Sequence, residues 1–143
     1  MTTRGLVIWF SLVLAVAAFG RWDMERARIG RCRLDGTRIT PVFQVDLMQS
    51  GQVLASFCSL RCASEWPDVP AGGYWRVRDE VTGEAIDAAA AIFVESAVVT
   101  VPSRQDRTHA FGSWIDAMNH ASGYDGITVA CPLVLPPPPD AEP

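Results

Sequence analysis

Residues 52–62, QVLASFCSLRC, run from an apolar strand directly into the start of a short helix. The turn dipeptide Ser50-Gly51 precedes this stretch, and residues 38–46 mix β-branched residues with a proline and a phenylalanine. Two such runs on either side of a turn dipeptide predict a β-hairpin. The helix that Cys58 opens should end before Pro67, since the residue before a proline is pushed out of helical geometry. We therefore expect a hairpin followed by a helix.

The chain downstream repeats this order of elements. Residues 74–79, YWRVRD, alternate apolar and charged side chains, which indicates a half-buried strand. After it we expect a turn at Thr82-Gly83, a helical turn at 86–91, a strand at 92–101, a loop to residue 108, a helix at 111–122 with Phe111, Trp114, Ile115 and Met118 on one face, a left-handed stop at Gly123, and a strand at 127–131. The sequence thus predicts an α+β domain of two ββαβ-like units behind an N-terminal hydrophobic helix.

Composition excludes several classes of function. All 12 basic residues among the 143 are arginine, so Schiff-base lysine chemistry and the lysine of a phosphate-binding loop are excluded. The formal net charge of −4 does not favour a nucleic-acid partner. We divide the chain into a signal peptide or membrane anchor (1–20), an arginine-rich linker (21–31), the predicted α+β domain (32–131) and a proline-rich disordered tail (132–143).

The N-terminal segment leaves the membrane side open. Residues 5–20 carry no charge. This segment is longer than a typical signal-peptide core and shorter than a typical membrane-spanning helix. Ala15-Val16-Ala17 is a cleavage-type pattern and favours export. In contrast, Arg4 stands alone before the segment, whereas five arginines lie within residues 21–33, and this bias favours a cytoplasmic domain.

Three cysteines are the main candidates for a functional site. Cys58 and Cys62 are four residues apart, a spacing that stacks two side chains on one helix face, and Cys32 offers a third sulfur. Thiolates select Cu(I), Zn(II) or iron–sulfur clusters. Two alternatives remain: the four cysteines, including Cys131, form disulfides in an exported protein, or they are inert core residues.

Other ligand candidates are weaker. His109 is the better of the two histidines, His120 being the other, because neutral imidazole binds Cu(I) and Zn(II). Met48 offers a thioether, whereas Met118 is expected to be core filler because it has helical spacing with apolar neighbours. The acidic residues within 79–87 are expected to form a solvated face.

Several segments resemble a known family. Residues 79–88 (DEVTGEAIDA), 91–96 (AIFVES), 109–111 (HAF) and 123–126 (GYDG) resemble the NosL family of copper-binding accessory proteins for nitrous oxide reductase maturation. Residues 57–62 resemble the treble-clef metal-trafficking motif called TRASH. The resemblance implies a fold related to organomercurial lyase and a periplasmic, membrane-attached protein that holds Cu(I). Where the family has C-G-M, this chain has Cys32-Arg33-Leu34, and it lacks the family's lipidated cysteine.

These observations lead to one functional hypothesis and one alternative. We expect a membrane-attached, extracytoplasmic Cu(I) chaperone, not an enzyme, that passes copper to a protein partner in reductase maturation and binds no nucleic acid. Zn(II) is the alternative metal. The expected ligands are Cys58, Cys62, Cys32, His109 and Met48. The alternative function is a disulfide-stabilised interaction module without a metal.

Overall fold

The computed structural model describes residue 13 and residues 30–134. The expected N-terminal hydrophobic helix, most of the arginine-rich linker and most of the proline-rich tail lie outside these residues. Among the described residues, no helix combines the length and the apolar character needed to span a membrane.

The first half of the domain is a four-stranded antiparallel sheet with a short helix. It consists of η1 (Pro41–Phe43), β1 (Val45–Gln49), β2 (Gln52–Phe57), α2 (Leu60–Ser64), β3 (Gly73–Arg78) and β4 (Ala85–Asp87). The strand order is β2-β1-β3-β4. Helix α2 therefore joins β2 to β3, which lie on opposite sides of β1.

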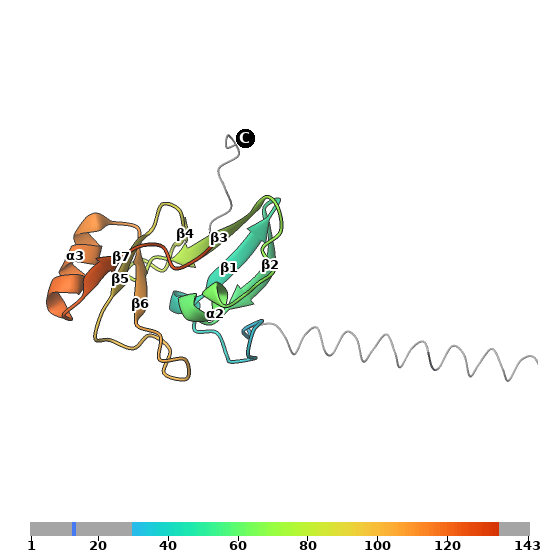
Figure 1. Cartoon of the computed structure of the whole chain (residues 1–143), viewed down its shortest axis with the longest axis horizontal. Helices are drawn as coiled ribbons and strands as arrows, with labels where there is room; N and C mark the ends of the chain where they lie inside the picture. Colours follow the sequence, from blue (N-terminus) through green and yellow to red (C-terminus); the bar gives the residue numbers. More distant parts are fainter. Residues whose placement is uncertain (1–12, 14–29, 135–143) are drawn as a thin grey trace, which may run out of the picture.

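The second half has the same connectivity. It consists of β5 (Ile92–Glu95), β6 (Thr108–Phe111), α3 (Trp114–Gly123) and β7 (Ile127–Val129), with the strand order β6-β5-β7. The first strand of each unit is again central, and the helix again connects its two neighbours. Figure 1 shows the two sheets side by side, with α3 on the outer face of the second. The α+β prediction with two ββαβ-like units is confirmed.

The first hairpin forms where the sequence predicts it, but its first strand begins later. Ser50 and Gly51 both have positive φ, 49° and 78°, as a two-residue hairpin turn with the right twist requires. Strand β1 begins at Val45, near the end of residues 38–46, because Pro41 opens the 3-10 turn η1 instead of extending a ladder.

Three expectations for the chain after β3 are wrong. Residues 86–91 form β4 and a turn, in which the Asp87 carboxylate accepts the Ala89 amide at 2.8 Å, and not a helical turn. Phe111 belongs to β6, where it pairs with Ile92, so α3 starts only at Trp114. The left-handed residue after α3 is Asp125, with φ 51°, and not Gly123.

The core lies between the sheets and under α3. One apolar cluster draws on both sheets, including Trp75 of β3 and Phe93 of β5, and it surrounds the buried cysteines. Helix α3 buries only Ala117 and Ala121. Met118 is 38% exposed, together with the more exposed Trp114 and Ile115, so the predicted core face of this helix in fact faces solvent.

Asp79 connects the two halves and is buried, in contrast to the expected solvated acidic face. Its carboxylate accepts the amides of Val81 at 2.8 Å and Thr82 at 3.0 Å in the turn after β3. The other oxygen accepts the Gly112 amide at 2.7 Å, between β6 and α3. Burial raises the pKa of Asp79, but the hydrogen bonds from Thr82, Gly112 and Val81 outweigh it and hold the pKa below its usual value.

We expect Asp79→Ala to lower the free energy of unfolding by about 2–4 kcal/mol, because it leaves three amide donors without their acceptor. A carboxyl group whose pKa is depressed by folding stabilises the fold above its unfolded pKa, and this contribution is lost as the pH falls through the folded pKa. The difference in free energy of unfolding between the parent and Asp79→Ala should therefore shrink below about pH 4. Urea unfolding at several pH values measures it. Glu84→Ala, in the same turn but exposed, is the control, and an equal loss in both variants would contradict the assignment.

Candidate metal centre

Three cysteines and one carboxylate converge in one cluster. One ligand atom each from Cys32, Asp35, Cys58 and Cys62 lies within 4.8 Å of the other three. The donors come from two segments, the turn that precedes η1 and the junction of β2 with α2. Three sulfurs and one oxygen make a compact donor set for a single soft or borderline metal ion.

The β2–α2 junction brings two of the sulfurs together. Ser59 is the N-cap of α2, and its hydroxyl accepts the Cys62 amide at 3.1 Å. Cys58 stands before this cap and so lies outside the helix, which differs from the predicted stacking of Cys58 and Cys62 on one helical face. The capped turn nevertheless places the two Sγ atoms 3.5 Å apart.

The turn at residues 32–37 supplies the other two donors. Its ends are closed by the Cys32 amide donating to the Thr37 carbonyl at 2.7 Å, and Gly36 takes a positive φ of 75°. The Arg33 amide donates to the Ser56 carbonyl at 2.8 Å, which fixes the turn against the end of β2. The Asp35 Oδ2 atom then lies 3.6 Å from the Cys62 sulfur.

Burial keeps the thiols of Cys58 and Cys62 protonated when no metal is bound. Desolvation and the hydrogen bonds with Cys62 and Cys32 raise the pKa of Cys58 well above its usual range. Burial also raises the pKa of Cys62 to about 11, although the Ser59 hydroxyl opposes this shift. A metal ion that binds these sulfurs must therefore displace protons, and binding should strengthen as the pH rises.

Arg104 balances the negative charge on the solvent side of the cluster. Its guanidinium lies 3.8 Å from Asp35 and forms an ion pair with Glu65, which follows α2. The pKa of Arg104 is raised most by negative charge on Cys62, and the charges of Glu65 and Asp35 add smaller increases. The interaction is mutual, so Arg104 favours the thiolate form of Cys62.

Two predicted or possible sulfur ligands lie elsewhere. Met48 is buried in β1 and is not part of the apolar cluster that surrounds Cys32, Cys58 and Cys62. Cys131 is half-buried after β7 and does not belong to the four-residue donor group. All four cysteines lie within the described residues 30–134 and none of them forms a disulfide there.

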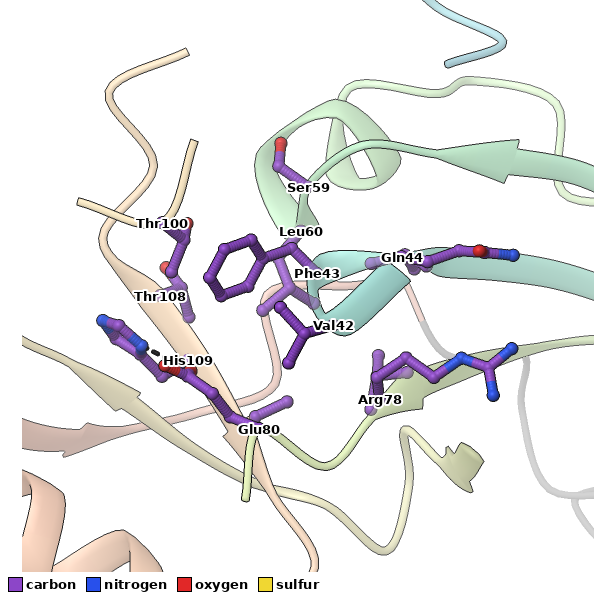
Figure 2. Close-up of a pocket in the computed structure, with 13 residues that line it drawn as sticks. Val42, Phe43, Gln44, Ser59, Leu60, Arg78, Glu80, Thr100, Thr108 and His109 are labelled. Atoms are coloured by element: carbon purple, nitrogen blue, oxygen red, sulfur yellow. Dashed lines mark hydrogen bonds and ion pairs between the residues drawn. The ribbon is translucent and has the colours of Figure 1, made fainter. Parts of the chain in front are cut away.

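His109, expected as a ligand beside the cysteines, lies in a second group with Glu80 and His120. Figure 2 shows the His109–Glu80 contact on one side of a narrow pocket. The lining of this pocket also includes Val42, Phe43 and Leu60, so apolar side chains lie between the histidine and the cysteine-bearing segment. Sequence reasoning missed Asp35, Arg104 and Glu80.

A solved structure has a similar fold. It is the crystal structure of the copper chaperone NosL from Shewanella denitrificans, with a TM-score of 0.57 over 73% of this chain and 89% of that chain. The fold is NosL-like. The two sequences are 21% identical, and no family model or curated protein matches this sequence. The predicted resemblance to NosL is thereby confirmed at the level of the fold, together with a cysteine cluster that can hold a metal.

Proposed function

We propose that this protein binds one Cu(I) ion at Cys32, Cys58 and Cys62 and delivers it to a protein partner. The observation that carries the proposal is the convergence of these three buried sulfurs within 4.8 Å. Thiolates are the ligands that Cu(I) prefers, and apolar surroundings exclude water and oxidants. The NosL-like fold supports the choice of copper, since a solved structure with a similar fold is that of a copper chaperone.

Delivery requires a route by which the ion leaves the cluster. The Asp35–Arg104 pair lies on the exposed side, and Arg104 is tied to Glu65 there by an exposed ion pair. Exposed ion pairs contribute little to stability, so they can open at small cost when a partner approaches. We place the exit for the metal at this side of the cluster.

The remaining parts of the proposal rest on the family resemblance and on the N-terminal sequence. We propose that residues 1–20 attach the protein to a membrane or direct its export, that the domain of residues 32–131 acts on the extracytoplasmic side, and that the partner belongs to nitrous oxide reductase maturation. The chain acts as a carrier and not as an enzyme, with no nucleic-acid partner.

Two alternatives each have an observation in their favour. Asp35 adds an oxygen to the three sulfurs, and a four-donor set of this kind suits tetrahedral Zn(II). The 3.5 Å separation of the Cys58 and Cys62 sulfurs also favours a disulfide-stabilised module, since oxidation needs only a small approach of the two atoms.

An anaerobic titration against a chromogenic Cu(I) chelator tests the proposal. We expect the reduced protein to take up about one equivalent of Cu(I), because the three sulfurs converge on one position. The same titration with a Zn(II) chelator tests the alternative metal. Failure of the reduced protein to compete for any Cu(I) would remove the proposed function.

A further inference from the structure

The second group of metal-ligand side chains lies outside the proposed copper site. Glu80 follows β3, His109 is on β6 and His120 is on α3, and one ligand atom of each lies within 4.8 Å of the other two. The His109 side chain is fully buried, whereas Glu80 is only partly covered. The fold thus brings together two imidazoles and a carboxylate from three distant parts of the chain.

The contacts of His109 show how a metal ion could replace a proton on its ring. Its Nδ1 atom lies 2.6 Å from the Glu80 carboxylate, so a proton lies between these two atoms when no metal is bound. Its Nε2 atom lies 3.0 Å from the Ser96 hydroxyl, which can donate or accept, and 3.2 Å from the Val98 carbonyl, which only accepts. A metal ion can take the place of the proton on Nδ1 if the ring carries its proton on Nε2, where the Val98 carbonyl accepts it.

Ser96 orients His120 in a similar way. The Ser96 hydroxyl lies 3.1 Å from His120 Nε2 and 3.0 Å from His109 Nε2, and it accepts the Val98 amide at 3.2 Å. When Nε2 of His120 donates to Ser96, its Nδ1 carries the free lone pair. Metal-binding histidines characteristically donate their other ring nitrogen to a neighbouring oxygen, and both histidines have such a partner here.

We propose that Glu80, His109 and His120 form a second metal site, for a borderline divalent cation of the Zn²⁺ class. Two imidazoles and one carboxylate match the ligand preference of Zn²⁺ and lack the sulfur that Cu(I) prefers. Bond lengths near 2 Å require Glu80 and His109 to separate by less than about 1 Å, which the partly exposed Glu80 side chain allows. The ion takes the place of the proton on His109 Nδ1, and the neutral ring then carries its one proton on Nε2, beside the Val98 carbonyl.

Histidine NMR on the full reduced chain tests this site directly, because His109 and His120 are the only histidines of the sequence. We expect two equivalents of Zn²⁺ to shift the imidazole ¹⁵N resonances of both rings, since Zn²⁺ at the cysteines coordinates no imidazole. Glu80→Gln should weaken the binding monitored at these resonances by at least about tenfold. Glu84→Gln, the same change at an exposed position of the same turn, should leave it unchanged.

Two results would overturn the second site. One is that both sets of imidazole resonances keep their positions when Zn²⁺ is added in excess, which would assign the Glu80–His109 contact to a proton alone. The other is that Glu80→Gln binds Zn²⁺ at the imidazoles as the parent does. If Glu80→Gln does not fold, His120→Gln, at a half-buried position of α3, provides the same comparison through the His109 resonances. Neither result depends on Cu(I) binding at the cysteines.

Discussion

Replacing Cys58 and Cys62 together with serine should lower the affinity for Cu(I) on the order of a thousandfold. The change removes two of the three sulfurs, namely the Cys58 and Cys62 Sγ atoms that lie 3.5 Å apart. A serine hydroxyl is a hard, protonated group that does not substitute for a thiolate. Cys32 and Asp35 would remain, and one thiolate with one carboxylate does not enclose a Cu(I) ion. Competition with a chromogenic Cu(I) chelator under anaerobic conditions measures the loss.

Cys131→Ser is the matched control for this experiment. Cys131 is half-buried and lies outside the donor group, so its replacement should leave Cu(I) affinity near that of the parent. Far-UV circular dichroism of each variant verifies that the fold is kept. Equal losses of affinity from Cys131→Ser and from the double variant would indicate a disulfide framework in place of a metal site.

The sequence predicts which helices and strands this fold contains better than the residues at which they begin and end. The alternation in residues 74–79 gives β3 because one face of a half-buried strand must be apolar, and β3 indeed alternates buried and partly exposed residues. Residues 108–111 were expected in a loop and the start of a helix, yet they form β6. Pairing with β5 decides this conformation, and such long-range contacts leave no periodic signal in four residues.

Three of the four donors of the cysteine cluster, Cys32, Cys58 and Cys62, were predicted from the sequence. The spacing of Cys58 and Cys62 indicates that their sulfurs meet, although a helix cap rather than a helical face brings this about. Asp35 stands three residues after Cys32 and before a glycine, a local signal that a turn returns the carboxylate to the cysteine. Arg104 has no such signal, because its position beside Asp35 depends on the packing of the β5–β6 connection.

The second cluster was beyond prediction for a similar reason. Its three donors are 29 and 11 residues apart along the chain, as the numbers of Glu80, His109 and His120 give, and no motif connects them. The acidic stretch 79–87 predicts a solvated face, but Asp79 and Glu80 turn inward to join the two sheets. Only the repeated ββαβ arrangement, which places β6 and α3 beside the turn after β3, brings the donors together.

Asp35→Ala should change the metal preference of the cysteine cluster. The variant loses the only oxygen in the donor group, which Zn(II) needs to complete a tetrahedral set, whereas Cu(I) is satisfied by two or three sulfurs. We expect the affinity for Zn(II) to fall by about a hundredfold and the affinity for Cu(I) to change by less than about tenfold. Parallel competition titrations with Zn(II) and Cu(I) chelators measure both.

Asp68→Ala is the control, because Asp68 is exposed and belongs to no donor group of the described residues. Loss of Asp35 also removes one partner of Arg104, which then keeps its ion pair with Glu65. A small fall in Cu(I) affinity in Asp35→Ala alone would reflect this rearranged charge. An equal, large fall for both metals would instead make Asp35 a ligand of Cu(I), and the carboxylate would then occupy the position that a soft third donor takes in a sulfur-only site.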